Sequence, residues 1–163
     1  MKKLIGVSSF FLLALVVIWF GILVPKQEVN QIRNEKYYDV TGDSLIEISH
    51  SMHENTPTIG IGSLFWSIKW DALCRVSVET VMTLPNLSEF EEFDERIKAS
   101  WVRFQTVLRV HEETHKFHAV NAAKEIAATR CIGGNDILEK WREIDQNFDL
   151  STGYGRLEGV VLR

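Results

Sequence analysis

The chain opens with its longest uninterrupted apolar stretch. The 21 residues from Leu4 to Val24 carry no charge, and an α-helix of that length, at ~1.5 Å per residue, spans a hydrocarbon core of about 30 Å. The stretch ends in bulky side chains apart from Gly21, whereas a cleavable signal ends in small residues. We therefore expect residues 1–25 to form a signal anchor that crosses the membrane as a transmembrane helix.

The rest of the chain begins with a polar segment and then alternates in short runs. Residues 26–36 predict a linker, and residues 37–163 predict one domain. A short helix is expected from Ser44 to a point before Pro57, because apolar residues recur there at helical spacing. Residues 74–82, which predict a strand, could hold an extended peptide by edge pairing. Three segments combine β-branched and aromatic residues with partial alternation and predict strands: residues 37–40, 65–70 and 74–82.

After Pro85 the apolar period changes from that of a strand to that of a helix. Ser88 and Glu91 have the spacing of a capping box, which predicts a helix start, and Gly133-Gly134 predicts its end beyond Ala128. A second helix, capped by Asn135 or Asp136, should follow and end near residue 148, before a tail that begins at residue 151. One stripe of the first helix recurs at steps of three or four residues: Phe90, Phe93, Ile97, Trp101, Phe104, Leu108, His111, His115, His118, Ala122 and Ile126.

These elements predict an α+β domain in which a small antiparallel sheet packs on the long helix and a further helix follows. With 163 residues, 45% hydrophobic and 25% charged, the chain is not disordered or cysteine-scaffolded. Its net charge is −4, and setting aside Lys2 and Lys3 with the apolar stretch makes the remainder more acidic. Such a domain offers little positive field to phosphates, so we expect no nucleic-acid partner.

The two cysteines, Cys74 and Cys131, form an even pair. A domain exported to an oxidising compartment would be expected to join them in a disulfide. Two free thiols in a cytosolic domain remain the alternative. The cysteine pair therefore favours export over a cytosolic location.

The sequence His111-Glu112-Glu113-Thr114-His115 lies within the long helix and has the form H-E-x-x-H. Residues four apart lie on one face of a helix, so both imidazoles can bind one tetrahedral Zn²⁺. Glu112 would lie beside the metal as a general base for a water whose pKa the metal lowers. The number of H-E-x-x-H matches expected by chance in a chain of this length and composition is roughly 0.01. The alternative is a helix with two satisfied inward-facing histidines and a solvated Glu112.

A catalytic zinc site needs a third protein ligand, which the motif does not supply. His118 lies on the same stripe but ~10.5 Å further along the axis than His111, too far to share one ion on a straight helix. We therefore expect His118 to support a metal ligand by hydrogen bonding, to face the substrate, or to have a structural role. Glu125 is further still, whereas Glu139 or Glu143 on the next helix could supply a carboxylate from across the site.

Several motifs together resemble a bacterial family of uncharacterised domains described as predicted secreted zinc-dependent proteases, over residues 37–159. They are Tyr38-Asp39-Val40-Thr41-Gly42, Trp66, Trp70, Cys74, Leu84-Pro85, Trp101, the H-E-x-x-H sequence, Cys131 and Phe148-Asp149-Leu150-Ser151-Thr152-Gly153-Tyr154-Gly155. The resemblance implies a zincin-like fold. The family's last motif has the form Y-D-x-x-T-x-H-G, in which the histidine would be the natural third ligand.

This chain has Tyr154 at the position of that histidine, so the resemblance implies Tyr154 as third ligand or as donor to a transition-state oxyanion. The resemblance then implies that Asp149 and Thr152 of the same motif lie behind the metal ligands and support them without binding the metal. A phenol, with a pKa near 10, is a poorer zinc ligand than imidazole at neutral pH. The departure therefore leaves the catalytic competence of the chain open.

The sequence and the resemblance together predict a zinc metallopeptidase of the bacterial inner membrane, with a single span and its domain in the periplasm or outside the cell. His111 and His115 would bind Zn²⁺, Glu112 would act as base, and the substrate would be a peptide or protein. The alternative function is a non-catalytic, envelope-tethered binding or assembly domain that keeps a zincin-like frame. The missing histidine favours this alternative, whereas the presence of Glu112 favours the enzyme.

Overall fold

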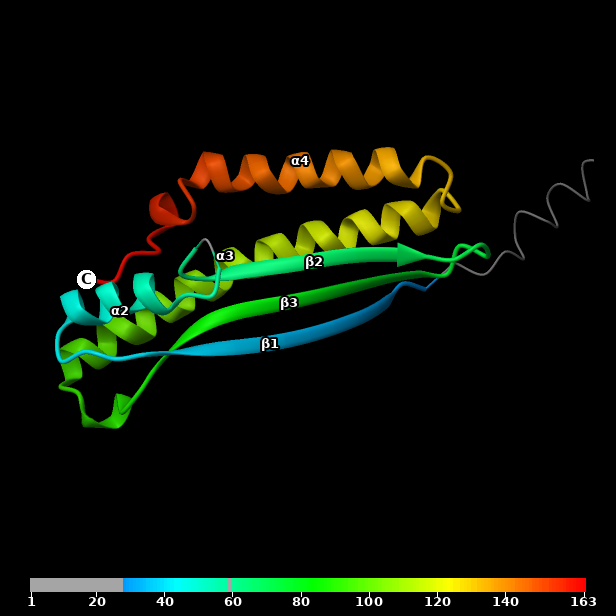
Figure 1. The fold of residues 1–163 in the computed structure, drawn as a ribbon. Helices are drawn as coiled ribbons and strands as arrows, with labels where there is room; N and C mark the ends of the chain where they lie inside the picture. The colour runs from blue at the N-terminus through cyan, green and yellow to red at the C-terminus, as the bar shows by residue number, and fades with distance from the viewer. Residues whose placement is uncertain (1–27, 59) are drawn as a thin grey trace, which may run out of the picture.

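The computed structural model describes residues 28–58 and 60–163 and shows an α+β fold with a three-stranded sheet (Figure 1). The long helix α3 lies against the sheet, and α4 packs beside α3 and also contacts Trp66 and Trp70 of the sheet. Short 3₁₀ turns precede α3 and follow α4. The elements are β1 (Asn30–Val40), α2 (Leu45–Asn55), β2 (Ser63–Trp70), β3 (Val76–Leu87), η1 (Phe90–Glu92), α3 (Glu95–Ala128), α4 (Gly134–Thr152) and η2 (Arg156–Glu158).

The sheet is mixed, so the antiparallel sheet expected from the sequence is wrong for one of its two pairings. β3 is the central strand, with β2 antiparallel on one side and β1 parallel on the other. The chain leaves β1 and enters β2 at the same end of the sheet, so β2 runs opposite to β1. The turn after β2 reverses the chain direction once more, so β3 runs parallel to β1 (Figure 1). Because β3 is paired on both sides, it is not available for edge pairing with a peptide; β1 and β2 are the edges.

β1 begins at Asn30 rather than at Tyr37, so most of the predicted linker belongs to the sheet. Residues 30–36 pair in register with residues 77–83 of β3 through their backbone. Their side chains are all exposed, and this explains why no hydrophobic alternation marks the strand in the sequence.

The predicted transmembrane helix at residues 1–25 lies outside the described residues. Within residues 28–58 and 60–163, no helix has both the length and the apolar character needed to cross a bilayer.

The short helix expected from Ser44 is confirmed as α2, and the Ser44 side chain caps it by accepting the N–H of Glu47. The predicted capping box before α3 is wrong, because the Asp94 Oδ1 caps α3 by accepting the N–H groups of Arg96 and Ile97, both at 2.9 Å. The N-cap of α4 is Gly133, in a left-handed conformation, rather than Asn135 or Asp136.

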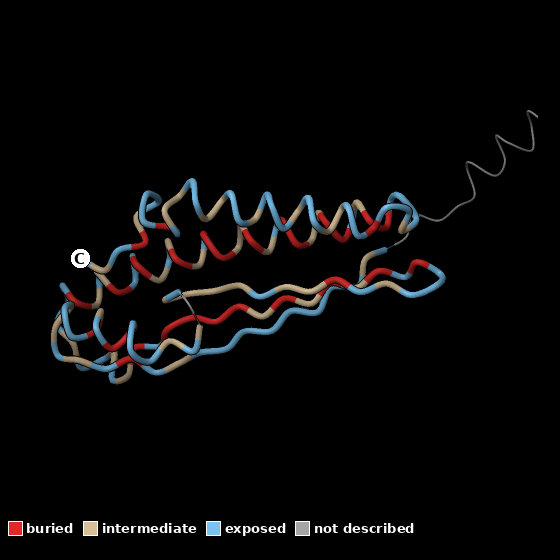
Figure 2. The backbone as a smooth tube through the Cα atoms, turned by 45° about the horizontal axis from the view of Figure 1, so that its top comes forward, coloured by how far each residue is buried: buried red, intermediate tan, exposed pale blue. Residues whose placement is uncertain are grey.

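The apolar stripe of α3 forms the centre of the core, as the periodicity predicted (Figure 2). One cluster, around Phe104 and Leu108, packs on the C-terminal half of β3, and a second, around Ala122 and Ile126, packs on its N-terminal half. Between them the buried face of α3 carries His111, Glu112, His115 and His118. α4 is different: Gly134 is its only buried residue, and it lies at the first turn.

A disulfide joins Cys74, after the end of β2, to Cys131, in the turn between α3 and α4. Neither cysteine is free. The expected pairing is therefore confirmed in the structure, and it fastens the end of the helical pair to the sheet.

Candidate metal centre

α3 holds His111 and His115 one turn apart on its buried face, with side chains 6% and 7% exposed. Their Nε2 atoms lie 3.3 Å from each other. The apolar residues that precede them on the same stripe, Phe104 and Leu108, are buried in the core and fix the rotation of the helix. The local sequence thus brings together the two imidazoles that the spacing predicted.

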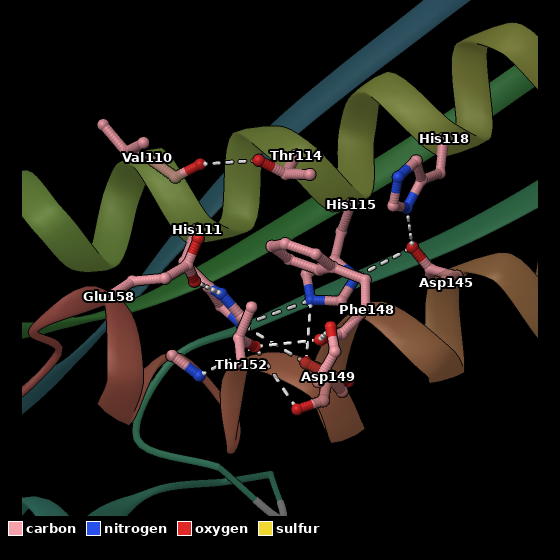
Figure 3. Close-up of polar contacts among 12 residues, drawn as sticks. Val110, His111, Thr114, His115, His118, Asp145, Phe148, Asp149, Thr152 and Glu158 are labelled. Carbon is pink, nitrogen blue, oxygen red and sulfur yellow. Dashed lines mark hydrogen bonds and ion pairs between the residues drawn. The ribbon is translucent and has the colours of Figure 1, made fainter.

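α4 contributes a carboxylate to the same point. Asp149 Oδ1 lies 3.2 Å from His111 Nε2 and 3.1 Å from His115 Nε2 (Figure 3). With the 3.3 Å between the two nitrogens, the three atoms form a nearly equilateral triangle. A tetrahedral zinc ion with bonds of ~2.0–2.1 Å places its ligand atoms about 3.3 Å apart. His111, His115 and Asp149 therefore form a group that could hold a metal ion and leave a fourth position open.

A second group of possible ligands has the dimensions of a hydrogen-bonded cluster. Asp145 Oδ1 lies 2.8 Å from both His115 Nδ1 and His118 Nδ1, and its Oδ2 accepts the Trp66 indole N–H at 2.9 Å. Distances of 2.8 Å are shorter than the edge of a zinc tetrahedron and typical of charge-assisted hydrogen bonds. Burial raises the pKa of Asp145, but the hydrogen bonds from His115 and Trp66 outweigh it and lower that pKa.

His111 has a carboxylate at its other ring nitrogen as well. Its Nδ1 lies 2.6 Å from Glu158 Oε2, which reaches the ring from η2 (Figure 3). Phe148 of α4 stacks on the His111 ring, with centroids 4.9 Å apart, and meets the rings of His115 and His118 edge to face. Phe148 thus contacts all three imidazoles, and three carboxylates, Asp145, Asp149 and Glu158, lie beside their nitrogens.

Glu112 is buried beside this cluster and is only 3% exposed. Burial raises the pKa of Glu112 to about 7; the nearby His115 opposes the shift, whereas the charges of Asp149 and Asp145 add to it. The backbone before β2 closes over the carboxylate, because a Cβ added at Gly62 would lie 2.9 Å from Glu112 Oε1. A carboxyl group that ionises near neutral pH can accept and return a proton.

Two residues of the predicted C-terminal motif have other contacts. The Tyr154 side chain is 67% exposed, and its backbone N–H donates to Asp149 O at 2.8 Å. The group of possible ligands contains Asp149 instead of Tyr154. Thr152 donates its hydroxyl to Phe148 O at 2.9 Å and accepts the N–H of Gly155, so it closes the end of α4.

The glutamates considered as distant ligands also lie elsewhere. Glu125 binds Lys140 and the indole N–H of Trp141. Glu139 and Glu143 are exposed on α4. The carboxylate from the next helix is supplied by Asp149.

The sequence did contain a signal for Asp145 and Asp149. They are four residues apart on α4, as His111 and His115 are on α3, and the two pairs lie at equal distances from residue 130 in the turn. In a helical hairpin, residues at equal distances from the turn face each other. No comparable pattern marks Glu158, which lies among the three glycines of the tail and belongs to no periodic segment.

A family model matches residues 35–131, which is more than half of the chain and includes His111, Glu112 and His115. The match ends at Cys131, before the helix that carries Asp145 and Asp149. No curated protein and no solved structure matches the chain. The chain belongs to the family described as bacterial protein of unknown function (DUF922).

Proposed function

We propose that this chain is a zinc-dependent metallopeptidase. The observation that carries the proposal is the triangle formed by His111 Nε2, His115 Nε2 and Asp149 Oδ1, with edges of 3.1–3.3 Å. Two imidazoles and one carboxylate are a common ligand set of catalytic zinc, whereas structural zinc sites use four protein ligands. Glu112, buried at the next position along α3, adds the acid–base group that a hydrolytic site needs.

A zinc ion bound there would polarise a substrate carbonyl and make a water acidic enough to be ionised near neutral pH. Glu112 accepts a proton from the attacking water while the water oxygen bonds to the peptide carbonyl carbon. When the C–N bond breaks, Glu112 gives the proton to the leaving amine. The raised pKa of Glu112, about 7, suits a group that must both accept and release a proton.

The sheet edge next to the centre supports a peptide as substrate. β2 is an edge strand, and the side chain of its Trp66 reaches Asp145 beside the histidines. An extended peptide could add to this edge by main-chain hydrogen bonds, which places a peptide bond near the metal without requiring a particular side chain.

The proposed location is the outer side of a bacterial inner membrane, with the apolar segment at residues 4–24 as the anchor. Its length supports a span. The disulfide between Cys74 and Cys131 supports an oxidising compartment, because cytosolic thiols are kept reduced.

The decisive experiment compares Glu112→Gln with Glu113→Gln in the full-length chain, purified in detergent and loaded with zinc. Glu113 is the neighbouring glutamate, 43% exposed and paired with Lys116. Hydrolysis of a mixture of unstructured peptides, measured by mass spectrometry, should fall by at least ~10²-fold in the Glu112 variant. It should be unchanged in the Glu113 variant, and both variants should keep one zinc per chain.

Equal hydrolysis by wild type and Glu112→Gln would contradict the proposed mechanism. A wild-type chain that binds zinc and cleaves none of the peptides would instead favour the non-catalytic binding or assembly domain.

A further inference from the structure

We propose that Glu158 is a positioning residue that fixes His111 as a metal ligand through its Nδ1–H. The inference rests on the proposed metal centre and adds the C-terminal turn η2 to it. Glu158 Oε2 lies 2.6 Å from His111 Nδ1. The His111 side chain is only 6% exposed, so its Nδ1 has little access to water and needs a partner within the protein.

The contact decides which nitrogen of His111 faces the metal position. A carboxylate accepts hydrogen bonds, so it holds the proton of a neutral imidazole on Nδ1 and leaves the lone pair on Nε2. The Nε2 atom of His111 is the one in the triangle with His115 Nε2 and Asp149 Oδ1. Glu158 therefore keeps the ring in the tautomer and rotation in which it can bind a cation.

Asp145 makes the equivalent contact to His115, whose Nδ1 lies 2.8 Å from Asp145 Oδ1. When each ring is neutral and its proton is on Nδ1, two nitrogen lone pairs and one carboxylate converge at 3.1–3.3 Å. Three acceptors at this distance repel one another and are stabilised by a cation, either a metal ion or a proton, among them. The two positioning carboxylates thus turn the triangle into a site that selects a cation.

The backbone of the C-terminal turn is built to place Glu158. Gly155 and Gly159, on either side of η2, have φ values of +78° and +98°, which favour glycine. A Cβ at Gly155 would lie 2.7 Å from Val160 Cγ2 and 3.4 Å from His111 Cγ, so the turn packs directly on the histidine. Val160 is 5% exposed in the core and donates its N–H to Gly155 O at 3.0 Å. The turn is therefore fixed from both ends.

The experiment measures zinc affinity of the full-length chain in detergent, by competition with a chelator, for Glu158→Ala and Glu158→Gln. Loss of the carboxylate should weaken zinc binding by ~10–100-fold in the alanine variant, the usual effect of removing a hydrogen-bond partner of a ligand. The glutamine variant should stay within a few-fold of wild type, because its amide oxygen still accepts the Nδ1–H. Glu143→Ala, which removes an exposed carboxylate on α4, is the matched control and should leave the affinity unchanged.

A second measurement needs no metal. Nitrogen NMR of the metal-free chain should show His111 with its proton on Nδ1 in the wild type, and a shift toward Nε2–H in Glu158→Ala. Either an Nε2–H tautomer in the wild type or an unchanged zinc affinity in Glu158→Ala would overturn the positioning role. Zinc binding without peptide hydrolysis would overturn only the proposed function. If the chain binds no zinc, the tautomer of His111 still tests the positioning role of Glu158.

Discussion

The two nitrogens of each imidazole in the centre contact different carboxylates. The Nε2 atoms of His111 and His115 face Asp149, while their Nδ1 atoms face Glu158 and Asp145. In the proposed centre, one carboxylate would therefore bind the metal and the other two would orient the histidines. Substitutions at these carboxylates should therefore have different effects on metal binding, because some would remove a ligand and others only the partner of a ligand.

Asp149→Ala should weaken zinc binding by more than ~100-fold, because it removes a ligand rather than the partner of one. Tyr154→Phe should leave zinc affinity within about twofold of wild type, since the exposed hydroxyl lies outside the group of possible ligands. Chelator competition on both variants checks the pair. Loss of affinity in Tyr154→Phe together with normal binding by Asp149→Ala would restore the tyrosine as third ligand.

Much of the residue-scale site could be predicted, because an i,i+4 spacing within one helix fixes relative positions locally. His111, Glu112 and His115 therefore lie together as the motif predicts. The third ligand depends on the packing of two helices, which the motif does not contain. The resemblance to a Y-D-x-x-T-x-H-G motif implied Tyr154 as the third ligand. Tyr154 lies five residues beyond Asp149, whose carboxylate reaches the histidines.

At the scale of the elements, the disulfide links two turns that approach each other only in the folded chain. Cys74 and Cys131 are 57 residues apart, so the crosslink restricts a long loop of the unfolded chain. In the entropic model this contributes about 4 kcal/mol to the free energy of unfolding.

Replacing both cysteines by alanine should therefore lower the free energy of unfolding by roughly 4 kcal/mol, measured by urea denaturation of the chain in detergent. The wild-type chain treated with a reductant should lose a similar amount, whereas the double variant should not respond to the reductant. A double variant as stable as the oxidised wild type would show that the bond closes without constraining the unfolded state.

Element boundaries were predictable where side chains are buried on one face and not where they are exposed. The stripe of α3 and the short helix that begins after Ser44 follow from apolar spacings that the structure keeps. β1 has exposed side chains along most of its length, and its pairing with β3 rests on backbone hydrogen bonds that leave no mark in the sequence. The start of α3 was misplaced because two capping sequences, at Ser88 and at Asp94, lie close together.

At the scale of the molecule, the centre lies between two helices and the C-terminal turn rather than within one element. α3 provides the histidines, and α4 and η2 provide the carboxylates (Figure 3). The histidines and carboxylates come together because of the sheet order and the packing of α4 against α3. Both depend on contacts between residues far apart in the sequence. The part of the chain matched by the family model thus holds only half of the centre.

The sparse burial of α4 has a consequence for local unfolding. Since only Gly134 is buried in this helix, the region of residues 145–152 is held to α3 largely through Asp145, Phe148 and Asp149. A cation between the helices would add directly to the opening free energy of that segment, by about 2.7 kcal/mol at a hundredfold excess over its Kd. Deuterium uptake at residues 145–152 should therefore quicken on chelation while uptake in α2 stays constant; equal uptake in both states would mean that α4 is anchored without the ion.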